Sequence, residues 1–88
     1  MRVSKVLRVT NRLGLHARPA SLFVQAAVRF QSSIKVAKGD IEVNGKSMMG
    51  IMMLAAEQGA ELVLTAEGED APQALQELER LFQRKFDE

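Results

Sequence analysis

The sequence contains no cysteine, no tryptophan, no tyrosine and only one histidine among its 88 residues. The lack of cysteine excludes disulfide bonds, thiolate metal sites and a cysteine nucleophile. The single histidine, His16, excludes metal sites built from several imidazoles and leaves no second imidazole to act as a base. We therefore expect no metal site, and nothing in the sequence calls for a cofactor.

Long apolar runs and flexible segments are also missing. No run approaches the roughly 20 apolar residues that cross a bilayer, and residues 1–5 alternate polar and apolar side chains, unlike a signal peptide. Glycine and proline together account for only 8 residues, so no linker divides the chain. We expect one domain over residues 1–88, located in the cytoplasm and not inserted in a membrane.

Charge is unevenly distributed along the chain, although the net charge is only +1. Residues 1–46 carry 9 basic and 2 acidic side chains, and residues 47–88 carry 3 basic and 9 acidic ones. A basic half that also clusters in space favours an acidic partner or a phosphate group. Because a fold can interleave its two halves, the distribution alone indicates such a partner without establishing it.

Hydrophobic periodicity predicts elements in the order β-α-β-β-α-β-α. Alternating side chains indicate strands, and apolar residues three and four positions apart indicate helices. The expected strands cover residues 3–10, 34–38, 41–44 and 60–67, and the expected helices cover 17–29, 48–56 and a segment that begins near residue 71. This pattern indicates a two-layer α+β domain, with a mostly antiparallel sheet and the helices on one side.

Three local signals refine these elements. Gly59 is the expected stop of the second helix. Asp70 is expected to cap the third helix in a capping box with Gln73. Phe86 is expected on the apolar stripe of that third helix.

The segment GLHARPA, residues 14–20, places His16 where a loop meets the first turn of a helix. That turn exposes backbone N–H groups without intrahelical partners and carries partial positive charge, so it binds anions such as phosphate. Arg18 adds a guanidinium that can hold phosphate oxygens, and a neutral imidazole beside them is a nucleophile. The local chemistry allows a phosphohistidine, although from the residues alone a surface or helix-capping histidine is an equal alternative.

This segment resembles the active-site signature of the HPr family, the histidine-containing phosphocarriers of the bacterial sugar phosphotransferase system. A second segment, KSMMGIMM at residues 46–53, resembles the regulatory serine site of that family and the hydrophobic helix that follows it. The order of the two segments and the chain length also suit the family. The resemblance implies an open-faced β-sandwich, in which three helices pack on one face of a four-stranded antiparallel sheet.

The resemblance also implies roles for individual residues. His16 would accept a phosphoryl group on its Nδ1 from phosphorylated Enzyme I and pass it to an EIIA domain of a sugar transporter. Arg18 would hold the phosphate, and the backbone N–H groups of Ala17 and Arg18 would donate to it. Such a carrier is consumed and regenerated, so it is a transfer partner more than an enzyme. In some members the end of the chain approaches the histidine, a contact that Asp87 and Glu88 do not support here.

Ser47 has two compatible interpretations. From its position it is a helix N-cap, which stabilises a helix by about 1 kcal/mol. From the resemblance it is also the target of an ATP-dependent HPr kinase/phosphorylase, and a transcriptional regulator is then a further partner. A phosphate at this position would add negative charge beside the docking surface and repel an acidic Enzyme I.

Four methionines, Met48, Met49, Met52 and Met53, belong to a segment that is apolar nearly all round. In a chain this short part of that surface must stay exposed, and methionine suits contact with partners of different shapes. The resemblance places Met48, Met49 and Met52 on the partner-binding patch. We expect Met53 and Leu54 in the core.

Two other functions are compatible with parts of the sequence. One is an HPr-like regulator of a nitrogen-type or catabolite-repression pathway that acts mainly through partner binding, although the retained His16 argues against a purely regulatory protein. The other is a small nucleic-acid-binding module, which the net charge of +1 and the lack of an aromatic pair on a strand face disfavour. We expect a monomer, because a carrier must dock with several proteins in turn.

Overall fold

The computed structural model describes residues 1–88 and contains the predicted helices and strands in the predicted order. The strands are β1 (Arg2–Arg8), β2 (Ser33–Lys38), β3 (Ile41–Asn44) and β4 (Glu61–Glu67), and the helices are α1 (Ala17–Ala27), α2 (Met48–Met53) and α3 (Ala71–Gln83). A short turn, η1 (Lys85–Asp87), follows α3. The bounds of the four strands and of α1 differ from the predicted bounds by at most two residues.

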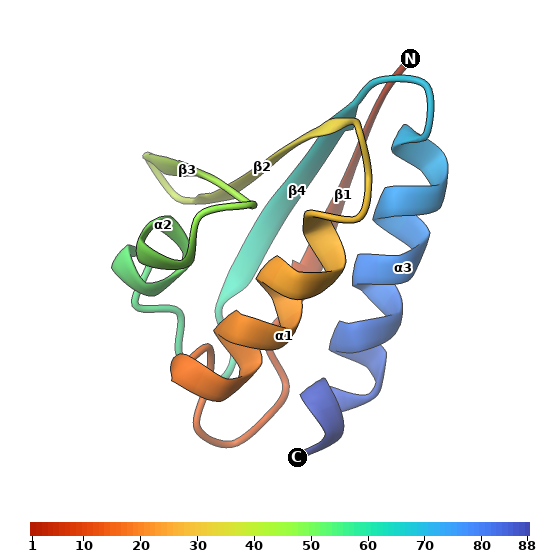
Figure 1. The fold of residues 1–88 in the computed structure, drawn as a ribbon. Coiled ribbons are helices and arrows are strands. Elements are labelled where there is room, and N and C mark those ends of the chain that lie inside the picture. The colour runs from red at the N-terminus through yellow and green to blue at the C-terminus, as the bar shows by residue number, and fades with distance from the viewer.

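The four strands form one antiparallel sheet in the order β1-β4-β2-β3. All three helices lie on one face of this sheet and the other face is open (Figure 1). Alternate residues of the strands point toward the helices and join the apolar faces of the helices in a single core. The largest fully buried side chains include Phe23, Phe86, Ile34, Ile51, Leu54, Leu62, Leu64 and Leu78. The predicted open-faced β-sandwich is confirmed.

The second helix is shorter than predicted, because α2 ends at Met53 and not at residue 56. Ala55 has a left-handed φ of 48°, which a right-handed helix cannot include. The Lys38 ammonium donates to the carbonyls of Leu54 (3.1 Å) and Ala55 (3.2 Å) and so satisfies two acceptors at the end of α2. The predicted stop at Gly59 is therefore wrong.

Asp70 does not form the predicted capping box with Gln73, since its side chain makes no capping bond to α3. Its carboxylate instead accepts from the N–H groups of Gln31 and Ser32, both at 2.9 Å, and from the Ser32 hydroxyl at 2.5 Å. These bonds hold the pKa of Asp70 below its ordinary value, and the bond from the Ser32 hydroxyl contributes most. The carboxylate thus ties the loop before β2 to the start of α3.

Beyond α3 the backbone turns left-handed. Lys85, Phe86 and Asp87 have φ values of 55°, 53° and 61°, a region that residues other than glycine rarely adopt. Phe86 is therefore not on the helical stripe as predicted, yet it is only 1% exposed and its ring centroid lies 5.0 Å from that of Phe82. Burial of this ring stabilises the turn, and the turn brings the end of the chain toward the loop that precedes α1 (Figure 1).

Candidate functional site

His16 is the N-cap residue of α1, with an extended backbone (φ −75°, ψ −172°) and no capping bond from its side chain. Its carbonyl oxygen accepts the first intrahelical bond, from the Ala20 N–H at 3.0 Å. The N–H groups of Ala17 and Arg18 precede that bond and have no intrahelical acceptor, and Pro19 has no N–H. The half-exposed imidazole therefore stands beside two free backbone donors at the positive end of the helix.

The loop before His16 is held against the segment that follows α2. Gly14 has a φ of 71°, and a Cβ at this position would overlap the Ala56 carbonyl oxygen and approach Glu57 Cα to 2.8 Å. The next residue, Leu15, is buried, and its N–H donates to the Ala56 carbonyl at 2.9 Å. Only glycine fits this close approach, and the approach fixes the position of His16 relative to the segment that follows α2.

The side chain of Glu88 reaches the imidazole from the end of the chain. Its Oε2 lies 2.8 Å from His16 Nε2, and its Oε1 accepts from Asn11 Nδ2 at 2.9 Å. The bond from Asn11 is the main cause that lowers the pKa of Glu88, followed by the bond to His16 and the charges of His16 and Arg18, while burial opposes them. An ionised carboxylate only accepts hydrogen bonds, so Nε2 carries the proton and Nδ1 of the neutral ring has a free lone pair.

Asn11 holds this carboxylate in place and is itself buried, with 2% of its surface exposed. Its Nδ2 also donates to the Gly14 carbonyl at 2.6 Å, so both of its partners are acceptors and the amide orientation is fixed. Its Oδ1 is the one buried side-chain polar atom of the protein without a hydrogen-bond partner. Asn11 thus joins the loop, Glu88 and His16 in one chain of hydrogen bonds.

Three of the nine basic residues of the first half form ion pairs with acidic residues of the second half. Lys5 pairs with Glu79, Arg8 with Glu61, and Arg29 with Glu77, so the two halves interleave in space. The arginines nearest the imidazole in sequence, at positions 12 and 18, are exposed and make no ion pair. Because the two halves interleave, the basic half of the sequence does not form a separate basic half of the molecule, and Arg12 and Arg18 leave unpaired positive charge near His16 in sequence.

Ser47 is the N-cap of α2, as predicted, because its Oγ accepts from the Gly50 N–H at 3.0 Å. Its side chain is only partly buried. Position 50 is also closely packed, since a Cβ there would lie 3.2 Å from Val43 Cβ. The hydroxyl that would be modified is thus held at a helix end that packs against β3.

The methionines of α2 form an exposed surface, which we call the methionine patch: Met48, Met49, Met52 and Met53 are 37%, 76%, 42% and 68% exposed. The prediction that Met53 lies in the core is wrong, whereas Leu54, at 1% exposure, is buried as predicted. A short helix can bury only one narrow side, and here Ile51 and the following Leu54 occupy it. The patch adjoins the site, because α2 packs beside α1 and the residues after α2 contact the loop before His16.

The chain matches the family model described as the phosphorylation site of the PTS HPr component over residues 3–84. The chain belongs to the HPr family. It is 56% identical over 86 residues to the phosphocarrier protein HPr of Treponema pallidum, with 98% of both chains covered. It is 46% identical over 82 residues to HPr of Xylella fastidiosa (strain Temecula1), with 93% of this chain and 92% of that protein covered.

Solved structures of the HPr family share the fold. The structure of HPr from Thermoanaerobacter tengcongensis has a TM-score of 0.95 at 46% identity and covers 98% of this chain and 97% of its own. The HPr-like protein Crh of Bacillus subtilis is also similar, at 47% identity over 76 residues, covering 86% of this chain and 89% of Crh. None of the helices here combines the length and the apolar character that a membrane-spanning helix needs.

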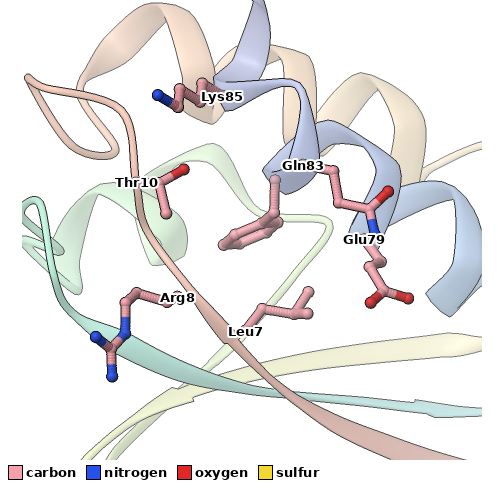
Figure 2. A pocket seen from close by; sticks show the side chains of 7 residues that line it. Leu7, Arg8, Thr10, Glu79, Gln83 and Lys85 are labelled. Carbon is pink, nitrogen blue, oxygen red and sulfur yellow. The ribbon is translucent and has the colours of Figure 1, made fainter.

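No surface pocket includes His16 or Arg18 in its lining. The pocket in Figure 2 lies between β1 and α3, and its lining includes Leu7, Thr10, Phe82, Gln83 and Lys85. The imidazole instead stands on an open surface. Such a site suits a residue that another protein must reach, and not one that encloses a small substrate.

From the sequence we predict His16, Arg18 and Ser47 as site residues, assign no part to Asn11 and do not expect the end of the chain to reach His16. The structure instead places Glu88 against the imidazole. The contact between His16 and Glu88 spans most of the chain and depends on a left-handed turn of residues that rarely adopt it. No periodic pattern signals such a contact. Asn11 offered a weak signal, because an asparagine in a loop three residues before a glycine is a residue type that bonds to nearby backbone.

Proposed function

We propose that this chain is a phosphocarrier, in which His16 accepts a phosphoryl group on Nδ1 from phosphorylated Enzyme I and passes it to an EIIA domain. The observation that carries this proposal is the 2.8 Å contact between His16 Nε2 and the Glu88 carboxylate. It directs the ring proton to Nε2 and leaves Nδ1 as the nucleophile, at a helix end with two free backbone donors.

In the transfer step the Nδ1 lone pair attacks phosphorus, and the N–P bond of the donor histidine breaks as the new N–P bond forms. The donor nitrogen keeps the electron pair of the broken bond. The N–H groups of Ala17 and Arg18 and the Arg18 guanidinium stabilise the phosphoryl oxygens. A ring that carries phosphorus on Nδ1 and a proton on Nε2 is positive, and the Glu88 carboxylate offsets that charge. Transfer to the EIIA histidine follows the same steps in reverse.

The surface around this site supports docking with an acidic partner. The exposed thioethers of Met48, Met49 and Met52 provide adaptable apolar contact, and the unpaired guanidinium groups of Arg12 and Arg18 provide positive charge. We propose that Enzyme I and EIIA use this same surface in turn. Because each partner must leave before the next docks, the contact area is expected to be small.

Incubation with phosphoenolpyruvate and Enzyme I, followed by intact-mass spectrometry at neutral pH, tests the proposal. One phosphate is expected on the chain, lost in mild acid and absent from His16→Ala. Because the chain has no other histidine, a phosphohistidine can only be His16, and ³¹P–¹⁵N NMR identifies the nitrogen that carries the phosphate. Phosphate on Nε2, or no transfer by an Enzyme I that phosphorylates a known HPr, contradicts the mechanism.

A regulatory modification of Ser47 is the second candidate. The likeness to Crh and the partly exposed hydroxyl beside the methionine patch favour it. A phosphate there would face a partner that docks on the patch and lower its affinity by repulsion. HPr kinase/phosphorylase with ATP is expected to add one acid-stable phosphate to the protein and none to Ser47→Ala; incorporation into the alanine variant contradicts the assignment.

We further propose a monomeric single domain that works in the cytoplasm. A dimer is known for HPr from Thermoanaerobacter tengcongensis, so light scattering coupled to size-exclusion chromatography is the direct test. A mass near the 9.7 kDa of one chain is expected over the whole concentration range. A mass of twice that value contradicts the monomer.

A further inference from the structure

The methionine patch concentrates the oxidisable side chains of the protein on one exposed surface. Four of the six residues of α2 are methionine, and even the least exposed, Met48, has 37% of its surface accessible. The chain contains no cysteine, tryptophan or tyrosine. A mild two-electron oxidant therefore meets thioether sulfur before any other readily oxidised group.

The patch is separated from the one remaining methionine. Met1 is also exposed, at 75%, but it precedes β1, whereas α2 packs against β3. These two strands are the opposite edges of the sheet. The protein thus contains an internal control, a methionine of similar exposure that lies away from the proposed docking surface.

Oxidation of the patch changes its surface chemistry without removing a core side chain. Ile51 and Leu54 are fully buried and hold α2 to the domain, whereas none of the four methionines is buried. A sulfoxide is polar and accepts hydrogen bonds, so a partner that covers it must supply a donor or leave it unsatisfied. The expected consequence is weaker docking by a folded protein whose His16 site is unchanged.

We propose that Met48, Met49, Met52 and Met53 form a reversible oxidation site through which peroxide uncouples this chain from Enzyme I. This inference rests on the proposed carrier function and adds a form of regulation to it. Each thioether sulfur donates an electron pair to one oxygen of hydrogen peroxide, the O–O bond breaks, an S–O bond forms and water is released. The sulfur is oxidised by two electrons and the peroxide is reduced. A dithiol reductase reverses the step, because two thiols become a disulfide while the sulfoxide oxygen leaves as water.

The test compares each protein before and after treatment with hydrogen peroxide, with oxygen addition counted by peptide mass mapping. The proteins are the unmodified chain, Met1→Leu, and a variant with all four patch methionines changed to leucine, which keeps the patch apolar. Enzyme I-dependent phosphorylation gives kcat and KM for each form. For the unmodified chain and for Met1→Leu, oxidation is expected to raise KM about tenfold with little change in kcat. The four-leucine variant, whatever its own KM, is expected to show the same KM before and after peroxide treatment. Methionine sulfoxide reductase is expected to restore the KM of the oxidised unmodified chain and of oxidised Met1→Leu.

The outcomes separate this inference from the carrier function. If the untreated chain accepts phosphate but its KM is unchanged with all four sulfurs oxidised, the oxidation site is refuted and the carrier function stands. An equal rise in KM for the four-leucine variant also refutes it, because damage elsewhere is then responsible. Failure of every untreated protein to accept phosphate overturns both. Circular dichroism of the oxidised chain should be unchanged, and unfolding would contradict an effect on docking alone.

Discussion

Replacement of Phe86 by alanine is expected to release the end of the chain from His16 while costing less stability than its burial suggests. The ring is 1% exposed and packs against Phe82. Deletion of such a side chain costs about 3–5 kcal/mol where the surroundings remain in place. In Phe86→Ala the surroundings can rearrange. Lys85, Phe86 and Asp87 have a left-handed backbone, and without the buried ring we expect them to return to ordinary conformations.

The magnitude follows from the balance of these two effects. Return of the three residues to ordinary conformations recovers about 1–2 kcal/mol each, or about 4–5 kcal/mol together. Loss of the backbone bonds that Asp87 and Glu88 donate within the turn costs about 1 kcal/mol each. The net loss for Phe86→Ala is therefore about 2 kcal/mol, which lowers Tm by about 10 °C in a domain of this size.

Urea unfolding gives the change in stability, and long-range ¹H–¹⁵N NMR of the single imidazole shows which nitrogen carries the proton. Phe23→Ala is the matched control. Phe23 is equally buried, but it lies inside α1, where the backbone cannot rearrange to relieve the loss of the ring. The control is expected to lose about 3–5 kcal/mol and to keep the proton of His16 on Nε2. A loss of that full size in Phe86→Ala, with the His16–Glu88 contact retained, would refute the reasoning.

Three further predictions concern the supports of the site. Gly14→Ala is expected to lower the free energy of unfolding by about 2 kcal/mol or more, because the new methyl group meets the Ala56 carbonyl in a strained backbone; urea titration measures it, and a neutral effect contradicts the close approach. The lowered pKa of Asp70 adds stability that is complete above its ordinary value of 3.8 and is lost as the pH falls through the lower folded value. Thermal melts of the protein and of Asp70→Asn should therefore converge in acid, and a constant difference argues against the loop bonds. Ser47→Ala is expected to cost about 1 kcal/mol through loss of the helix cap, whereas Ser47→Asp should retain most of it; equal losses in both variants contradict the cap.

Most of the fold was predictable, because its elements follow local patterns. Alternation along the strands and the apolar stripes of α1 and α3 reflect a sheet that is covered on one side only. The errors arose where a tertiary contact overrode a local rule. Asp70 has the sequence of a capping residue, yet the backbone of the neighbouring loop offers its carboxylate three donors. Met53 has a core-like side chain, yet Ile51 and Leu54 already occupy the one side of this short segment that packs against the core.

The same distinction between local patterns and tertiary contacts applies to the site. His16 and Arg18 are two positions apart, so the motif alone places them on one helix end. The residues that determine the state of the imidazole are Asn11 and Glu88, and their bonds depend on the packing of two chain segments far apart in sequence. A left-handed turn of ordinary residues has no compositional signature, since it exists only because Phe86 is buried. The position of the candidate histidine at a helix end could thus be predicted, but the nitrogen that carries its proton could not.

The open position of His16 has a consequence for the lifetime of the phosphorylated protein. No hollow encloses the imidazole, so bulk water reaches a phosphoryl group there as freely as a partner does. No pocket wall encloses the N–P bond, so its protection from hydrolysis depends on the few donors beside it and on the Glu88 carboxylate. Such a molecule relays phosphate well but stores it poorly. The phosphorylated fraction of the protein would therefore follow the current ratio of donor to acceptor activity. If phosphorylation by the donor stopped, hydrolysis would empty the phosphorylated pool without a phosphatase.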